Sequence, residues 1–156
     1  MAVVALATVQ GAYADELSWK GQSNNHGGRV EYGYFVDPSD EGFNVEFAET
    51  MPLTITCNGF DGSLIVIVPG DLPNSEVGQK VQFVVDESVL EYGAGLSYVG
   101  GDYTSVPIIE LLKGDPLMEA LMGGGSANVF VAGYEVMTMP LNGTRKLFTK
   151  HLRPCL

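Results

Sequence analysis

The stretch Leu53-Thr-Ile-Thr-Cys57-Asn-Gly-Phe-Asp-Gly-Ser-Leu64-Ile-Val-Ile-Val68 contains two kinds of strand joined by a glycine-rich turn. Over residues 53–57, apolar side chains alternate with threonines, as expected for a strand with one packed face and one exposed face. Residues 64–68 are apolar at every position, which indicates a central strand covered on both faces. Asn58 to Gly62 has the composition of a turn. The stretch therefore predicts the middle of an antiparallel sheet.

Strand-like segments extend outward from this stretch in both directions. They are residues 30–36 and 43–48 before it, and residues 81–85, 90–98 and 128–139 after it. Gly93 and Gly95 weaken the segment 90–98 or mark a bulge in it. Residues 21–28 contain three glycines, four polar residues and a histidine. This composition predicts a loop rather than regular structure.

Three short helices are predicted in the second half of the chain. Ser105-Val-Pro107 resembles a helix cap that leads into residues 108–112. Asp115-Pro116 begins a second helix, which the glycines at 123–125 end. Asn142-Gly-Thr144 begins a third helix that Pro154 ends, although the same three residues also match a glycosylation acceptor.

These segments amount to about seven strands and two or three short helices. The chain of 156 residues fits one domain. Because no crossover helix follows each strand, a doubly wound α/β sheet is excluded. We expect a mainly β (α+β) fold, an antiparallel β-sandwich or partly open barrel, with one helix closing the C-terminus.

Residues 1–14 carry no charge and end in Ala12-Tyr13-Ala14, a pattern that signal peptidases accept. Because a positively charged start is missing, we interpret residues 1–14 as a truncated signal peptide and residues 15–156 as a single β-rich domain. The alternative is a first buried strand or a short hydrophobic arm. A signal peptide predicts a periplasmic or secreted protein.

The chain has two cysteines, Cys57 and Cys155. In an exported chain they are most simply a disulfide, which would close a loop of about a hundred residues and contribute roughly 4–5 kcal/mol. The alternative is a metal site that includes His151, four residues before Cys155. No paired-cysteine spacing supports that alternative, so we predict the disulfide and neither a metal nor a cofactor.

Nineteen acidic residues against eight basic ones give a net charge of −11. A nucleic-acid binder needs a basic surface, so that class is excluded. No apolar run approaches the ~20 residues of a membrane-spanning helix, so we expect no integral membrane segment.

The charges are unevenly distributed along the chain. Residues 30–79 contain nine acidic residues and neither lysine nor arginine, with aromatic residues interleaved. Half of the basic residues lie near the C-terminus, at Arg145, Lys146, Lys150 and Arg153. A Cys57–Cys155 bridge would place this basic helix beside the acidic sheet region and offset part of its self-repulsion.

The acidic, aromatic surface suits a basic protein partner. We predict that the partner-binding residues are Tyr32, Tyr34, Asp37, Asp40, Glu41 and Glu46. The alternative is that the acidic charge only keeps an exported protein soluble. Weak calcium binding at Asp37, Asp40 and Glu41 is a further alternative, although their spacing does not match an EF-hand.

Catalytic patterns are sparse. The two histidines are His26, in the glycine-rich stretch, and His151, on the apolar side of the last helix, and no nucleophile elbow is present. We expect a non-catalytic, exported binding domain. The alternatives are an inhibitor of a cationic hydrolase such as a lysozyme, and a small hydrolase that uses His26.

The C-terminal third also resembles a known family. Three features near the C-terminus carry this resemblance: the run Met139-Pro-Leu141-Asn-Gly143-Thr, the helix containing Lys146-Leu147 and Leu152, and the near-terminal Cys155. Together they are similar to the invasion-associated locus B family of small exported alphaproteobacterial proteins. The segment Asp115 to Gly123 resembles the helix-and-glycine segment of the same family. The resemblance, over residues 115–155, implies a β-rich envelope or secreted protein without an established catalytic site.

We expect mass spectrometry of the native protein to find a chain that begins at Asp15 and has no free thiol. Signal peptidase would remove residues 1–14, and the oxidising envelope would join the two cysteines. Retention of residues 1–14 together with two free thiols would contradict the predicted compartment.

Overall fold

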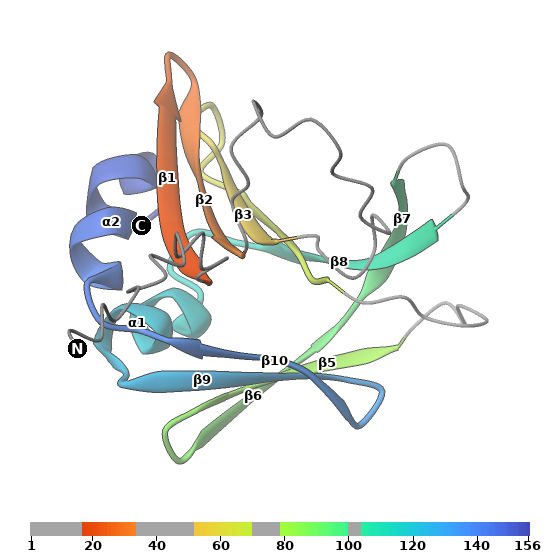
Figure 1. The fold of residues 1–156 in the computed structure, drawn as a ribbon. Coiled ribbons are helices and arrows are strands. Elements are labelled where there is room, and N and C mark those ends of the chain that lie inside the picture. Colours follow the sequence, from red (N-terminus) through yellow and green to blue (C-terminus); the bar gives the residue numbers. More distant parts are fainter. Residues whose placement is uncertain (1–16, 34–51, 70–78, 100–103) are drawn as a thin grey trace, which may run out of the picture.

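The fold is seen in a computed structural model that describes residues 17–33, 52–69, 79–99 and 104–156. Within these residues, ten strands form two separate antiparallel sheets (Figure 1). One sheet has six strands in the order β1 (Ser18–Asn24), β2 (Gly27–Gly33), β3 (Leu53–Asn58), β4 (Leu64–Ile67), β8 (Thr104–Leu111) and β7 (Gly95–Val99). The other has four, in the order β10 (Tyr134–Pro140), β9 (Ser126–Val131), β5 (Lys80–Val85) and β6 (Ser88–Gly93).

This arrangement confirms the predicted mainly β, antiparallel, sandwich-like fold. The core lies between the sheets, where every second residue of a strand is buried, as in the pattern of β5. Strand β4 lies between β3 and β8, as a central strand should. It is not covered on both faces, however: Leu64 and Val66 are buried, whereas Ile65 is 38% exposed.

The connection between β6 and β7 is one of those that carry the chain from one sheet to the other. Strand β6 ends at Gly93 and β7 begins at Gly95, so the predicted segment 90–98 is two strands in different sheets. Ala94 between them is buried, and its N–H donates to the carbonyl oxygen of Gln79 at 2.9 Å. The two glycines therefore mark a corner of the sandwich rather than a bulge.

The predicted loop at residues 21–28 is wrong. These residues belong to the β1–β2 hairpin, in which only Asn25 and His26 form the turn. The glycines are needed for close packing: a Cβ on Gly21 would lie 2.1 Å from His151 Cδ2, and one on Gly28 would lie 1.9 Å from the carbonyl oxygen of His151. The missing side chains let the C-terminal helix lie directly on the hairpin.

The predicted helix at residues 108–112 is also wrong, because this segment is strand β8. It pairs with β4 on one side and β7 on the other, and Ile109 and Leu111 point into the core. Pro107 has no N–H, but its carbonyl oxygen accepts a hydrogen bond from Val68 N at 3.0 Å. Tertiary pairing and β-branched side chains outweigh the cap-like sequence here.

The segment 128–139 is a hairpin of two strands, β9 and β10, instead of one. Its turn residues Ala132 and Gly133 have φ values of 50° and 83°. Positive φ at both central positions produces a tight turn that matches the twist of the two strands. Because alanine seldom adopts positive φ, this turn carried little sequence signal.

The other two predicted helices are confirmed. Helix α1 (Pro116–Gly123) begins after Asp115, whose Oδ1 accepts a hydrogen bond from Leu117 N at 2.9 Å and from the Tyr92 hydroxyl at 2.5 Å. Burial of the Tyr92 phenol, together with its bond to the Asp115 carboxylate, raises the pKa of Tyr92. Both contacts stabilise the start of α1.

Helix α2 (Thr144–His151) follows Gly143, which has a φ of 82° and provides no side-chain cap. Instead, the Thr144 hydroxyl lies 2.7 Å from the carbonyl oxygens of both Leu121 and Leu141. A short 3-10 helix, η1 (Arg153–Cys155), completes the chain. In Figure 1, the two helices lie side by side at one end of the sandwich.

Two contacts tie the chain ends to the sheets. Cys57 of β3 and Cys155 of η1 form the predicted disulfide, with a Cα–Cα distance of 5.8 Å and both residues buried. Trp19 Nε1 donates to the carbonyl oxygen of Pro140 at 2.7 Å, and the Trp19 ring packs edge-on against Phe148 at 5.3 Å. Trp19 therefore joins edge strands β1 and β10 of the two sheets.

We expect Gly28→Ala to lower the free energy of unfolding by about 1–3 kcal/mol, since the new methyl group would overlap the backbone of His151. Urea denaturation would measure this change. Gly93→Ala is the matched control: a Cβ there meets nothing within 4 Å, so its stability should stay within about 1 kcal/mol of the native value. Equal stability of the two variants would contradict the close packing.

Candidate functional site

The structure corrects one predicted partner-binding residue. Tyr32 is 3% exposed, on the core side of β2, and its ring lies 5.2 Å from that of Trp19. It is buried because it alternates with Glu31 and lies opposite Leu53 of β3. The other predicted residues, Tyr34, Asp37, Asp40, Glu41 and Glu46, lie outside the described residues, as does the whole calcium alternative.

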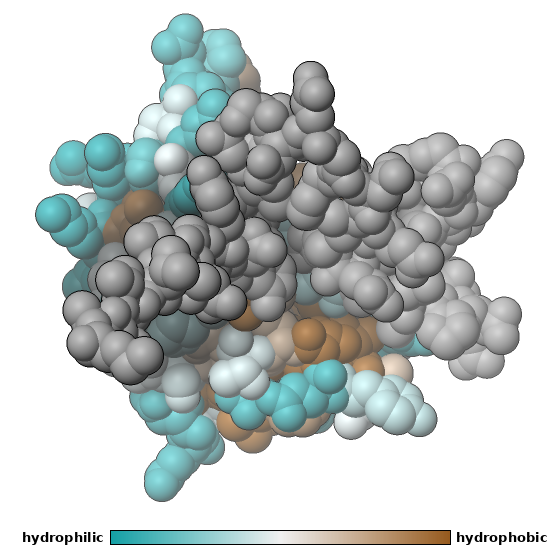
Figure 2. All heavy atoms as spheres, in the orientation of Figure 1, coloured by the Kyte–Doolittle hydropathy of each residue, from teal (hydrophilic) through white to brown (hydrophobic). Residues whose placement is uncertain are grey.

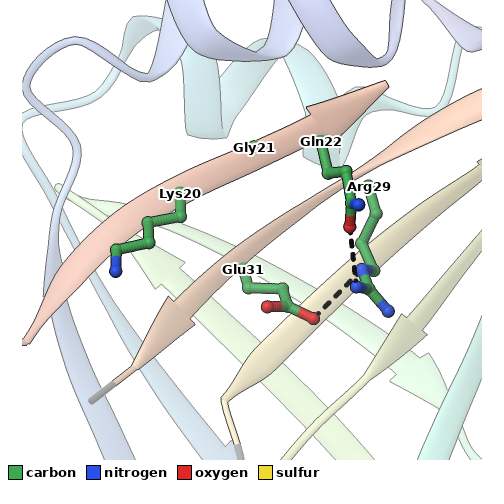
Figure 3. Close-up of a pocket in the computed structure, with 5 residues that line it drawn as sticks. All are labelled: Lys20, Gly21, Gln22, Arg29 and Glu31. Atoms are coloured by element: carbon green, nitrogen blue, oxygen red, sulfur yellow. Dashed lines mark hydrogen bonds and ion pairs between the residues drawn. The ribbon is translucent and has the colours of Figure 1, made fainter. Parts of the chain in front are cut away.

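A pocket lies on the opposite, outer face of the β1–β2 hairpin. It is lined by Lys20, Gly21, Gln22, Arg29 and Glu31 (Figure 3). The antiparallel register places Lys20 opposite Glu31 and Gln22 opposite Arg29. Since side chains alternate across a strand, these four polar side chains project from the face that does not contact the core.

Arg29 is the centre of this pocket. Its Nε lies 3.1 Å from Glu31 Oε1, and its Nη2 donates to Gln22 Oε1 at 3.0 Å (Figure 3). The side chain is nevertheless 48% exposed. These two contacts orient a guanidinium group that has five N–H donors, so the group can also bind a carboxylate or a carbonyl oxygen of a partner.

The outer face of the six-stranded sheet changes from polar on β1 and β2 to apolar on β4 and β8. A second pocket, lined by Gln22, Asn24, Gly28, Arg29 and Thr56, extends the polar region toward β3. Beyond it, Ile65, Ile67 and Ile108 are partly exposed on β4 and β8. A third pocket is lined by Gly93, Gly95, Ile108 and Glu110. Apolar area beside oriented polar groups is typical of a protein-binding surface.

His26, the base of the hydrolase alternative, lies in the β1–β2 turn. Its ring stacks on Phe60 with the centroids 4.7 Å apart. Among residues 17–33, 52–69, 79–99 and 104–156, no carboxylate or hydroxyl group hydrogen-bonds to the His26 side chain. The described part of the chain therefore offers His26 no partner of the kind that orients a catalytic histidine.

His151 has a structural environment. Its Nδ1 lies 2.7 Å from the hydroxyl oxygen of Ser23, and its ring lies over Gly21. The metal-site alternative of His151 with Cys155 is wrong, because the Cys155 sulfur is bonded to Cys57. Within the described residues, no group of three His, Cys, Asp or Glu side chains could hold a metal ion.

The basic helix lies against the acidic sheet region only in part. Helix α2 packs on β1 and β2, as the disulfide predicts. Its ion pair with another element goes to α1, however, where Arg145 Nη2 lies 3.5 Å from Glu119 Oε2.

None of the described helices is long and apolar enough to cross a membrane.

The sequence matches no protein-family model and no curated protein. In fold, the chain is similar to invasion associated protein B from Bartonella henselae, with a TM-score of 0.52. The similarity covers 85% of this chain and 90% of that one, at 16% sequence identity. This shared fold agrees with the predicted resemblance and extends it well beyond residues 115–155.

Sequence reasoning did not single out Lys20, Gln22 or Arg29. Their polar side chains alternate with Gly21 and Gly28, which hid the two-residue period of the hairpin. The signal was the alternation itself: Lys20 and Gln22 before the turn, and Arg29 and Glu31 after it. Only the pairing of β1 with β2 brings these four residues onto one face.

We expect Tyr32→Ala to lower the free energy of unfolding by about 3–5 kcal/mol, because it removes a buried aromatic ring. By contrast, Arg29→Gln should change it by less than about 1 kcal/mol, since the Arg29 side chain is 48% exposed and an ion pair near the surface contributes little. Chemical denaturation of both variants would measure this difference. A harmless Tyr32→Ala substitution would restore Tyr32 as a surface residue.

Proposed function

We propose that the protein is an exported, non-catalytic binding protein that engages a basic protein partner. Export is supported by the buried Cys57–Cys155 disulfide, because such bonds persist in oxidising compartments. The charge arrangement carries the choice of partner: nine acidic residues and no lysine or arginine occur between residues 30 and 79. Such a field speeds the encounter with a cationic protein.

The strand pairing supports a location for this interaction. Residues 34–51 connect β2 to β3, and these strands are paired at Tyr32 and Leu53. The predicted acidic residues at 37–46 lie between these two strands in sequence, a few residues after Arg29 and Glu31 of β2. The outer face that holds Arg29 and Glu31 would supply oriented hydrogen-bonding groups, while residues 34–51 would supply charge.

Asp61 is a second described member of the acidic stretch. Its carboxylate accepts hydrogen bonds from the Ser63 hydroxyl and the Ser63 backbone N–H, and these bonds lower the pKa of Asp61. A lowered pKa keeps this group charged to a more acidic pH than a free carboxylate. The negative charge of Asp61 is thus retained as the pH falls.

The test is charge reversal within the acidic connection, by which we mean residues 34–51 between β2 and β3 in the sequence. We expect the triple variant Asp40→Lys/Glu41→Lys/Glu46→Lys to lose at least about tenfold in affinity for a cationic probe protein, such as a lysozyme, by calorimetry. Added salt should weaken binding of the unmodified protein, because exposed charges are screened.

The matched control is Glu87→Lys/Glu119→Lys/Glu135→Lys, which changes the net charge equally at exposed positions away from the connection. If this control loses as much affinity, only net charge matters and no binding face exists. If neither variant changes binding, the acidic surface has no role in it. Inhibition of lysozyme by the unmodified protein would favour the inhibitor alternative over a binding protein without inhibitory activity.

A further inference from the structure

Two of the most exposed apolar side chains lie at one end of the six-stranded sheet. Phe60, in the β3–β4 turn, is 78% exposed, and Leu112, directly after β8, is 81% exposed. The two turns meet, since a Cβ on Gly62 would lie 3.3 Å from Cδ of Lys113 and 3.6 Å from the carbonyl oxygen of Pro154. We call this region the loop-end surface; it consists of His26, Phe60, Leu112, Lys113, Lys150 and Arg153.

Three basic residues lie at the same end of the six-stranded sheet as Phe60 and Leu112. Lys113 Nζ donates to the carbonyl oxygen of Pro154 at 3.3 Å, so Lys113 lies beside η1. Lys150 is in the last turn of α2, Arg153 begins η1, and both are exposed. Figure 2 shows hydrophilic side chains gathered over α2 and the tip of the β1–β2 hairpin. Phe60 and Leu112 thus lie at the end of the sheet that holds Lys113, Lys150 and Arg153, with Asp61 as the acidic neighbour of Phe60.

The loop-end surface is held in place before any partner arrives. Gly59 N donates to the carbonyl oxygen of His26 at 2.6 Å, which joins the β1–β2 and β3–β4 turns. The His26 ring stacks on Phe60, and the Cys57–Cys155 disulfide fixes η1 against β3. Little conformational entropy is therefore lost when this surface binds.

We propose that the loop-end surface docks on an anionic lipid bilayer. Phe60 and Leu112 enter the interfacial region, and Lys113, Lys150 and Arg153 contact acidic headgroups. This is how peripheral proteins combine apolar insertion with basic residues. The net charge of −11 does not prevent this docking, because at physiological salt charges more than about 8 Å away are largely screened.

The shape of the region favours a bilayer over an acidic peptide. Phe60 and Leu112 stand at the tips of turns, whereas the three pockets described above are lined by residues of the sheet strands. A peptide needs a groove or a sheet edge to bind, but a bilayer accepts protruding side chains. Apart from Asp61, which belongs to the acidic stretch, this docking uses residues and a charge sign different from those of the proposed partner face, so each proposal can fail without the other.

Asp61 opposes the cations of the loop-end surface and gives the sharpest test. Its Oδ1 accepts hydrogen bonds from Ser63 N at 2.9 Å and from the Ser63 hydroxyl at 2.6 Å. Asp61→Asn keeps an acceptor oxygen for this turn and removes the negative charge. The substitution should therefore strengthen binding to anionic vesicles severalfold. Sedimentation of Asp61→Asn without vesicles is the control for misfolding, because an aggregated variant would also pellet.

The experiment is co-sedimentation with phosphatidylglycerol-containing vesicles, compared with pure phosphatidylcholine vesicles. We expect binding to the anionic vesicles, and a loss of about tenfold or more in Phe60→Ser/Leu112→Ser and in Lys150→Gln/Arg153→Gln. Val89→Ser/Tyr134→Ser is the control: these side chains are 59% and 78% exposed on hairpins of the other sheet, and its binding should equal that of the unmodified protein.

Several outcomes would overturn the docking. They are no binding of the unmodified protein to anionic vesicles at physiological salt, an equal loss in the Val89/Tyr134 control, or weaker binding by Asp61→Asn. Capture by immobilised polyglutamate without vesicle binding would assign the loop-end surface to an acidic protein instead. In each of these cases the acidic partner face would still be tested separately by charge reversal at Asp40, Glu41 and Glu46.

Discussion

The covalent bond between Cys57 and Cys155 constrains where the C-terminal helix lies. It joins a central region of the six-stranded sheet to residues 98 positions later in the chain. Helix α2 is thereby held against β1 and β2, where Gly21 and Gly28 leave room for the backbone and ring of His151. Trp19 then connects the same hairpin to β10 of the other sheet. The first described strand and the end of the chain are thus parts of one packed unit.

The charges of the protein fall into two regions. Nine acidic residues and neither lysine nor arginine occur in sequence between residues 30 and 79, whereas Lys150 and Arg153 lie at the loop end of the six-stranded sheet. The two regions can serve different ligands, a basic protein and an anionic bilayer. An exported protein with both would hold a cationic partner near a membrane surface, which is consistent with the two proposals taken together.

Much of the fold was predictable because burial imposes simple periods on a sequence. The Asp115-Pro116 helix start and the glycines after α1 acted locally, and the structure confirms both. The alternation in residues 53–57 predicted strand β3 correctly but its exposed face wrongly, since Thr54 is buried. Predictions failed where glycine or proline serves packing between elements. Gly21 and Gly28 accommodate a helix, and Pro107 lies in a strand held by pairing on both sides. The sequence around such a glycine or proline carries no pattern that indicates which distant element packs against it.

The sequence by itself determined the class of fold, the acidic charge and the pair of cysteines, because these depend on composition and on spacing along the chain. Tertiary structure alone decided that Tyr32 is buried, that Lys20, Gln22, Arg29 and Glu31 form one pocket, and that the β3–β4 turn meets Lys113 and Pro154. The physical reason is that strand pairing and loop packing bring together residues whose separation in sequence carries no periodic signal.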